Sequence, residues 1–166
     1  MGGDKKKQLV TGVAAGRVVG SQERGPEYDH LNVFIGKWLT EGHTIAGPGG
    51  ASMKITASDI YEWAPGGFFV LHTAYGRIGE AAVGGIEIIG YDPETKVYRT
   101  HFFDSQGNVS SEELSFNEGR WHWRGPRVRC TGRFSEDGRQ IAALHERSDD
   151  GVVWTPSMDI TLTKAG

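Results

Sequence analysis

The sequence predicts an all-β protein: an antiparallel up-and-down barrel of about ten strands, preceded by one short helix. Segments in which apolar and polar residues alternate follow one another along the chain, and turn signals separate them about every 8–12 residues. Glycine is abundant, with 25 of 166 residues, and glycine-rich turns between short strands are typical of all-β proteins. A meander of this length removes its exposed edges most economically by closing, and a barrel of about this size encloses a small cavity.

Composition limits the classes of function. One domain is expected for 166 residues, and a net charge of -3 with a pI near 6.1 gives no electrostatic case for nucleic-acid binding. The single cysteine, Cys130, rules out an internal disulfide and fits a reducing compartment, so a cytoplasmic location is expected. No apolar run approaches the roughly 18 residues of a membrane-spanning helix. We expect neither a nucleic acid nor a membrane as partner, and a monomer or homodimer.

The chain is predicted to begin with a flexible arm, residues 1–25, ahead of a barrel domain at residues 26–166. Three lysines at positions 5–7 precede a short, glycine-containing apolar stretch, which fits an arm better than an exported leader. Residues 26–35 are predicted to form the short helix, because proline near the start and acidic residues in the first turn favour a helix N-terminus. The first strand is predicted to begin at Trp38.

The most informative stretch, residues 53–77, is predicted to form two strands joined by a tight turn at residues 64–67. The alternation places Asp59 and His72 on the drier faces of their strands, away from the faces that carry lysine and arginine. If the first and last turn residues pair, antiparallel pairing puts Asp59 directly opposite His72, where a carboxylate can bond an imidazole. An Asp59–His72 dyad inside the barrel is therefore predicted.

Later strands include residues 83–91, where Ile86 and Ile88 are expected to face inward and Glu87 outward, and residues 97–104. The Asp-Gly pairs at residues 137–138 and 150–151 are hairpin signals. The first predicts the pairs Phe134–Ile141 and Cys130–His145, and the second predicts Ile141–Ile160, Ala143–Met158 and His145–Pro156. The predicted interior is Ile55, Tyr61, Trp63, Val70, Ile86, Ile88, Phe102, Val128, Phe134, Ile141, Met158 and Ile160. The residues predicted to face water are Lys54, Arg77, Glu87, Arg99, Arg127, Arg129 and Arg133.

Gly36-Lys37-Trp38, at the junction of helix and first strand, resembles the G-x-W signature of the calycins, which include lipocalins and fatty-acid-binding proteins. The Gly-Tyr-Asp-Pro hairpin at residues 90–93, an aromatic strand ending in Phe103-Asp104-Ser105 and the closing Asp150-Gly151 strand resemble bacterial lipocalin-like domains of unknown function. The resemblance covers residues 26–163. It implies a barrel with a ligand cavity and with Trp38 packed across the floor. Residues 39–44 differ from the glycine-rich run of the haem barrel nitrobindin, and the usual lipocalin disulfide is absent.

Three functions from different classes remain open. The first is binding of a small hydrophobic or aromatic molecule, with Asp59, His72 and Tyr61 at its polar end. The residues expected to line that site are Trp38, Tyr61, Trp63, Tyr98, Phe102, Trp121, Trp123 and His145. The second is an acid/base enzyme of the isomerase, cyclase or hydratase type that acts through Asp59 and His72 on a hydrophobic substrate. The third is haem binding through His145 or His72.

Each candidate group also has a purely structural interpretation. Asp59 and His72 can be a buried polar pair whose members satisfy each other, and the aromatic residues can be core. Cys130 opposite His145 invites a thiol nucleophile, but no residue is evident to orient the histidine. His72, Asp59 and His145 offer three metal ligands, yet their spacing matches no metal motif. We therefore expect no metal and no cofactor.

Overall fold

The structure is a computed structural model, and it describes residues 23–166. It confirms the predicted fold class: a closed antiparallel barrel of ten strands with one short helix. The elements are η1 Pro26–Val33, β1 Gly36–Thr44, β2 Lys54–Trp63, β3 Phe69–Ile78, β4 Ala81–Asp92, β5 Val97–Asp104, β6 Val109–Asn117, β7 Arg120–Arg124, β8 Val128–Phe134, β9 Gln140–Arg147 and β10 Thr155–Lys164. No helix in this described part of the chain is long and apolar enough to cross a membrane.

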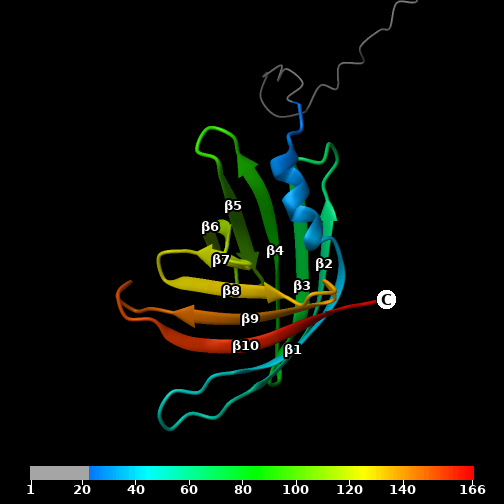
Figure 1. The fold of residues 1–166 in the computed structure, drawn as a ribbon. Helices are drawn as coiled ribbons and strands as arrows, with labels where there is room; N and C mark the ends of the chain where they lie inside the picture. Colours follow the sequence, from blue (N-terminus) through cyan, green and yellow to red (C-terminus); the bar gives the residue numbers. More distant parts are fainter. Residues whose placement is uncertain (1–22) are drawn as a thin grey trace, which may run out of the picture.

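Each strand pairs with its neighbours in sequence, and the first and last strands close the barrel. β1 pairs with β10 along its length, from Trp38 opposite Lys164 to Thr44 opposite Met158. The barrel is flattened: β2–β5 run steeply across the direction of β8–β10, so that two groups of strands face each other (Figure 1). Orthogonally packed sheets of this kind enclose their core between two inner faces, with side chains alternating inward and outward along each strand.

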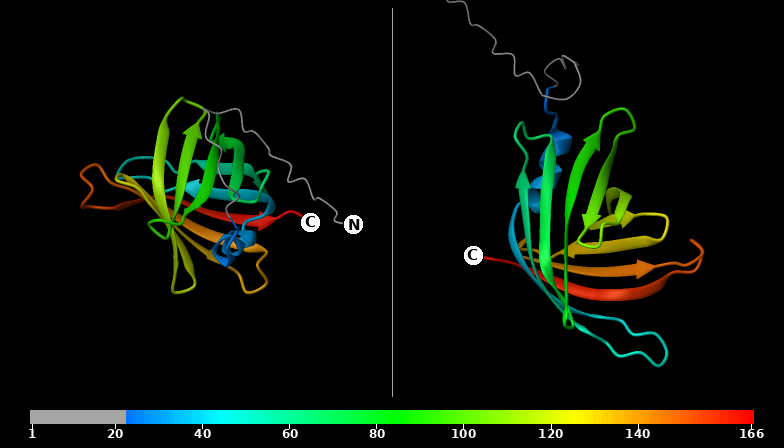
Figure 2. Two further views of the ribbon diagram at one scale, coloured as in Figure 1. Left: turned by 90° about the horizontal axis from the view of Figure 1, so that it is seen from above. Right: turned by 180° about the vertical axis from the view of Figure 1, so that it is seen from behind.

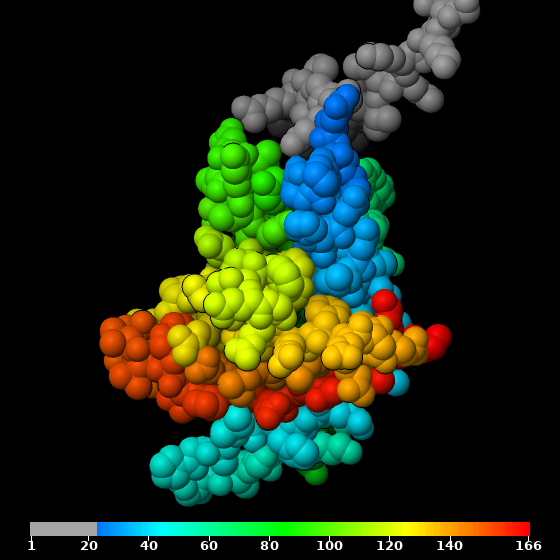
Figure 3. All heavy atoms as spheres, viewed as in Figure 1, coloured from blue at the N-terminus to red at the C-terminus, as the bar shows by residue number. Residues whose placement is uncertain are grey.

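The segment around η1 closes one end of the barrel. Leu31 and Phe34 are buried there, and Phe34 packs on Trp121 with 4.9 Å between ring centroids. The indole of Trp38 donates a hydrogen bond to the Phe34 carbonyl at 2.7 Å. Gly36 joins the two elements with a φ of 134°, a conformation that favours glycine. Figure 3 shows the atoms of η1 packed against strands on either side of it.

Several details of the predicted elements are corrected. The helix at residues 26–35 is a 3-10 helix over Pro26–Val33, and the first strand begins at Gly36, not Trp38. The last hairpin differs from the predicted register by two residues, so that His145 pairs with Met158 and Ile141 with Leu162. One residue of this shift is present beside the turn, where Thr155 pairs with Arg147, and a β-bulge between Pro156 and Met158 adds the other. The hairpin at residues 137–138 is confirmed, with Phe134 opposite Ile141 and Cys130 opposite His145. The arm predicted at residues 1–25 lies almost entirely outside the described residues.

The largest error concerns β4, whose two faces are exchanged relative to the prediction. Ile86 is exposed and Glu87 is buried, although the alternation of apolar residues indicated the reverse. The two-residue turn between Ile78 and Ala81 sets the register, and it pairs His72 with Glu87. Because His72 points inward, its partner must do the same, and a one-residue slip moves every side chain of a strand to the other face.

The remaining interior assignments are mostly confirmed. Ile55, Tyr61, Val70 and Ile141 are buried, and the remaining residues predicted inside are half-buried on the inner face, apart from Ile86, Ile88 and Val128. Ile88 is half-buried but lies on the outer face, as Ile86 does. Val128 is exposed because it is the first residue of β8, at the barrel rim. Of the residues predicted to face water, only Glu87 is buried and Arg129 half-buried; the others are exposed.

Trp38→Ala is expected to lower the free energy of unfolding by about 3–5 kcal/mol, because it leaves a cavity at the closed end of the barrel. Trp38 is fully buried, whereas its neighbour Leu39 is 51% exposed on the outer face of the same strand. Leu39→Ala is therefore the matched control and should change stability by less than about 1 kcal/mol. Urea unfolding monitored by circular dichroism measures both. Equal losses in the two variants would contradict the role of Trp38.

Candidate functional site

Four side chains form a hydrogen-bonded chain across the inner faces of β1–β4. The Thr40 hydroxyl donates to Asp59 Oδ2 at 2.5 Å, and Asp59 Oδ1 lies 2.9 Å from His72 Nε2. His72 Nδ1 lies 2.9 Å from Glu87 Oε2. All four residues are buried. The imidazole is therefore held at both ring nitrogens between two carboxylates, and Thr40, Asp59, His72 and Glu87 are termed the interior cluster.

The predicted contact between Asp59 and His72 is confirmed, but the register from which it was predicted is wrong by two residues. Tyr61 lies directly opposite His72, and Asp59 pairs with Ala74. The imidazole reaches Asp59 diagonally and stacks on the Tyr61 ring, with 3.9 Å between ring centroids. A shift of two residues keeps every side chain on its face, so the two groups still meet. The catalytic role of the dyad stays a prediction.

His72 carries a positive charge at neutral pH. Burial by itself lowers the pKa of His72, but the hydrogen bonds with Asp59 and Glu87 raise it further, to about 9. Both ring nitrogens are then protonated and donate to the two carboxylates. Two acidic side chains thus share one imidazolium.

Two further polar residues, Cys130 and His145, lie on β8 and β9. Cys130 Sγ is 3.5 Å from His145 Nε2. Burial raises the pKa of the Cys130 thiol and lowers the pKa of His145, so both side chains are neutral at pH 7. A protonated thiol is a poor nucleophile, and this pair lacks the thiolate that nucleophilic catalysis needs.

Glu112 on β6 adds a third carboxyl group to the interior. Burial and the charge of Glu87 raise the pKa of Glu112, while a hydrogen bond from Ser110 at 3.0 Å acts in the opposite direction. Glu112 is half-buried and belongs to the inward-facing positions of β6, together with Leu114. The raised pKa favours the uncharged form of Glu112 more than in a free carboxyl group.

The interior of the barrel is termed the lumen. Phe102, Met158 and Ile160 occupy inward-facing positions on β5 and β10, yet they are only half-buried. The tip of the Phe102 ring would meet a Cβ placed on Gly85 at 2.5 Å, so the ring points across the inner face of β4. Trp123 is also half-buried, and it packs on Phe34 with 5.7 Å between ring centroids.

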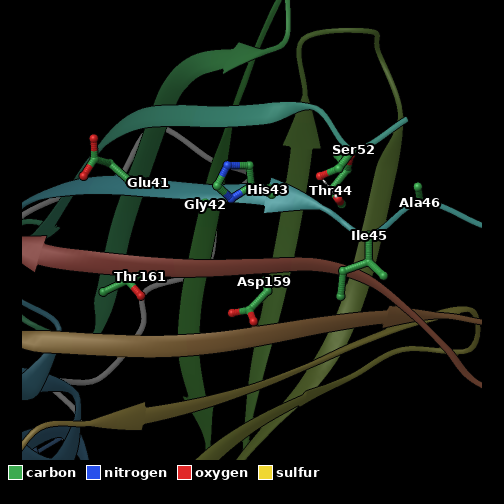
Figure 4. A pocket seen from close by; sticks show the side chains of 9 residues that line it. All are labelled: Glu41, Gly42, His43, Thr44, Ile45, Ala46, Ser52, Asp159 and Thr161. Atoms are coloured by element: carbon green, nitrogen blue, oxygen red, sulfur yellow. Dashed lines mark hydrogen bonds between the residues drawn. The ribbon is translucent and has the colours of Figure 1, made fainter. Parts of the chain in front are cut away.

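Two pockets occur elsewhere on the described part of the chain. One, of about 520 Å³, is an open hollow beside β1 and β10. Figure 4 shows its Glu41, His43 and Asp159 side chains, all of which are exposed. The other, also about 520 Å³, is lined by Cys130 and Trp123 together with the Arg129–Glu146 ion pair and Trp154.

The eight residues predicted to bind a ligand fall into two groups. Trp38, Trp63, Tyr98 and Trp121 pack around the η1 segment: Trp63 bonds Asn32 at 3.0 Å, and Tyr98 donates to the Glu27 carbonyl at 2.6 Å. Tyr61 and Trp123 also reach that segment, because each packs on Phe34 with 5.7 Å between ring centroids, and Tyr61 stacks on His72 as well. Phe102 lies opposite Glu87, and His145 contacts Cys130. The ligand-binding role of these residues stays a prediction.

Sequence reasoning missed Thr40, Glu87 and Glu112. A signal for Glu87 was present, because Gly79-Glu80 is a two-residue turn and Gly79 has a φ of 58°. Extending the ladder from that turn places Glu87 opposite His72. Thr40 and Glu112 carry no comparable signal, since an inward threonine or glutamate is unusual in an alternating strand.

The possible metal ligands are not assembled into a metal site. No group of three or more histidine, cysteine, aspartate or glutamate side chains in residues 23–166 is arranged to hold a metal ion. Asp59 and His72 bond each other, while His145 contacts Cys130. His72 also has no free nitrogen lone pair for haem iron, because both ring nitrogens face carboxylates.

Residues 23–149 match the family described as Protein of unknown function (DUF1579), and this span is well over half of the chain. The chain belongs to this DUF1579 family. A search of curated proteins found no match.

Two solved structures are similar in fold. Rv2717c from M. tuberculosis superposes with a TM-score of 0.62 at 9% identity, over 87% of this chain and 100% of that one. A de novo designed fluorescence-activating β-barrel has a TM-score of 0.42 at 14% identity, over 82% of this chain and 98% of that one. At 9% identity, the likeness to Rv2717c concerns the fold alone.

His72→Ala is expected to destabilise the protein by about 3–5 kcal/mol, because it leaves Asp59 and Glu87 buried without their cation. Urea denaturation at pH 7 measures the loss. His101→Ala is the control: this histidine is exposed on the outer face of β5, and its removal should cost less than about 0.5 kcal/mol. A His72→Ala protein as stable as the control would show that the two carboxylates do not need the imidazolium.

Stability should also fall at alkaline pH. The folded-state pKa of His72, about 9, lies above its ordinary value of 6.5, so the protonated ring stabilises the fold. That contribution, on the order of 3 kcal/mol, is complete below about pH 6.5 and disappears as the pH rises through about 9. Unfolding free energies at several pH values from 6 to 10, compared with those of His72→Gln, measure it. Parallel pH profiles for the two proteins would contradict this charge state.

Proposed function

We propose that this protein binds a small, largely apolar or aromatic molecule in the lumen, with the polar end of that molecule against the interior cluster. The proposal rests on the combination of a buried charged cluster with inward-facing apolar side chains that are only half-buried. Phe102, Met158 and Ile160 supply this apolar wall. Binding sites for small molecules are typically apolar with a few convergent polar groups.

The charge of the lumen favours one kind of polar end. Asp59, Glu87 and Glu112 supply three carboxyl groups; His72 bonds the first two, and Glu112 accepts a hydrogen bond from Ser110. A ligand carboxylate would add a negative charge close to these groups, whereas an ammonium or N–H group gains hydrogen bonds to them. The ligand proposed here is therefore an aromatic or apolar amine, or a neutral hydrogen-bond donor, and not a fatty acid.

Two observations support a calycin-like assignment of the barrel. Gly36-Lys37-Trp38 lies where a helical segment enters β1, and Trp38 packs at the closed end as the G-x-W resemblance implies. The DUF1579 match and the antiparallel ten-strand closure agree with a relative of the lipocalin-like domains. In such barrels the lumen is the natural place for a ligand.

The enzymatic alternative depends on the same residues but has less support. A general base needs a free lone pair near neutral pH, and His72 donates from both nitrogens with a pKa of about 9. The haem alternative now depends on His145 alone, and an absorption spectrum of the purified protein tests it. The interior cluster is better suited to hold a fixed charge than to move a proton.

A pair of fluorescent probes tests the proposal. Dansylcadaverine carries an amine and dansylglycine a carboxylate on the same fluorophore. Binding of the amine probe should shift its emission to the blue and enhance it. Its Kd should be at least about tenfold lower than that of the carboxylate probe, which corresponds to the free energy of one charged hydrogen bond. Tighter binding of the carboxylate probe would contradict the proposed polarity, and no binding of either probe would contradict a lumen ligand of this size.

Neighbouring residues on opposite faces provide matched controls. Glu112→Gln should weaken amine binding by about tenfold, while Glu113→Gln, on the outer face of β6, should leave it unchanged. Phe102→Ala should weaken the binding of both probes. Phe103→Ala, which changes the outer face of β5, should leave the binding of both probes unchanged. If the two members of a pair behave alike, the probe binds outside the lumen.

A further inference from the structure

The outer face of β2–β5 carries an unusually apolar surface. One residue from each of five successive strands forms a row across the sheet: Ile60, Thr73, Ile86, Phe103 and Val109, each opposite the next in the ladders. Ile88 and Leu71 pair beside this row, and Phe69 and Tyr75 flank it along β3. These residues are termed the apolar face, and the view from behind in Figure 2 looks toward its strands.

This face is uncharged at its centre and open to solvent. The outward positions of β3 from Phe69 to Tyr75 and of β4 from Ala82 to Gly90 hold no charged residue. Phe69 is 50%, Tyr75 65%, Ile86 45% and Phe103 44% exposed. Single exposed apolar residues are ordinary, but a contiguous set across neighbouring strands marks an interaction surface.

Glycines shape the face into a surface that another sheet can meet. A Cβ on Gly90 would lie 2.7 Å from the Phe69 ring, and one on Gly84 would lie 3.0 Å from the Tyr75 ring. The two rings therefore extend over the backbone of β4 instead of projecting away from it. The apolar face is therefore flat and is covered in part by aromatic rings, which suits face-to-face packing of two sheets.

We infer that the apolar face is the interface of a homodimer, with the same face of a second copy as its occupant. An isologous interface needs a self-complementary surface. A two-fold axis parallel to β3 lays the β2 flank of one copy over the β5 flank of the other. Glu62 shares its ladder row with Leu71, Ile88 and His101, so it faces His101 on the second flank. Arg99 is one outward position farther along β5, within reach of the long Glu62 side chain, and the contact occurs twice. The rim charges are complementary in this arrangement, while the centre is apolar.

The exposed area of the apolar face is large enough for a dimer interface. Because a whole Phe or Tyr side chain buries about 150–250 Å², Phe69, Tyr75 and Phe103 each leave roughly 100 Å² uncovered. With the aliphatic residues, the face offers on the order of 500 Å², at the upper end of the ~300–600 Å² that the largest patch of a monomer reaches. Together with its polar rim it approaches the ~800 Å² that each partner contributes to a standard interface.

The mass of the full chain in solution tests the interface, and this test is independent of any ligand in the lumen. Sedimentation velocity from about 1 to 100 µM should give a species of twice 18.1 kDa. Ile86→Arg should give the monomer mass, and Leu144→Arg, an aliphatic residue of the outer face of β9, should leave the dimer intact. Circular dichroism checks that each variant is folded, and the milder Ile86→Ser replaces Ile86→Arg if the latter is not.

Charge reversal tests the orientation. Glu62→Arg should weaken dimerisation by about tenfold, and the double variant Glu62→Arg/Arg99→Glu should restore it to within about threefold of the wild type. A wild-type protein that is monomeric throughout the concentration range overturns the proposal. A different protein or a membrane would then be the occupant of the apolar face. A dimer that survives Ile86→Arg overturns it equally, and failure of the double variant to recover overturns the proposed axis.

Discussion

The arrangement of the barrel interior depends on the imidazolium of His72 between two buried carboxylates. Asp59 and Glu87 would each be costly to bury alone, and His72 lies 2.9 Å from both. One residue on β3 thereby joins β2 to β4 through side chains in addition to the backbone ladders. Thr40 extends the connection to β1. The cluster connects four consecutive strands through side chains, so the contacts that would orient a ligand in the proposed function also stabilise the barrel.

The two halves of the barrel have different tasks because they are filled differently. At the η1 end, Phe34, Trp38 and Trp121 form a dense apolar core with little accessible surface. Toward the other end the inward positions become polar or small, with Glu87, Gly85 and Gly76 on adjacent strands. Close packing stabilises the first region, whereas the second has fewer large apolar side chains to pack. Aromatic residues that look equivalent in the sequence therefore differ in what they can contact.

Much of this architecture could be predicted from the sequence. Alternation and turn residues were enough for the ten strands, the closure and the Asp59–His72 contact, because an error of two residues in register leaves faces unchanged. The same reasoning failed at β4, where Ile86 and Ile88 lie outside and Glu87 inside. Hydrophobic alternation identifies the buried face only when the other face meets water. A strand with a charged inner face and an apolar outer face inverts the signal, and only the pairing across Gly79-Glu80 reveals it.

The pairing of β1 with β10 has a consequence for how the chain reaches its fold. These strands lie at opposite ends of the described sequence, and every other ladder joins neighbours in sequence. Contacts between distant segments carry a high entropic cost of loop closure and form slowly. During synthesis, hairpins from β2 onward can assemble as they emerge, while β1 keeps a free edge until β10 has been made. Leu162 and Lys164 lie near the end of that last strand and face the Trp38 region. The barrel thus becomes a closed surface only after β10 has left the ribosome.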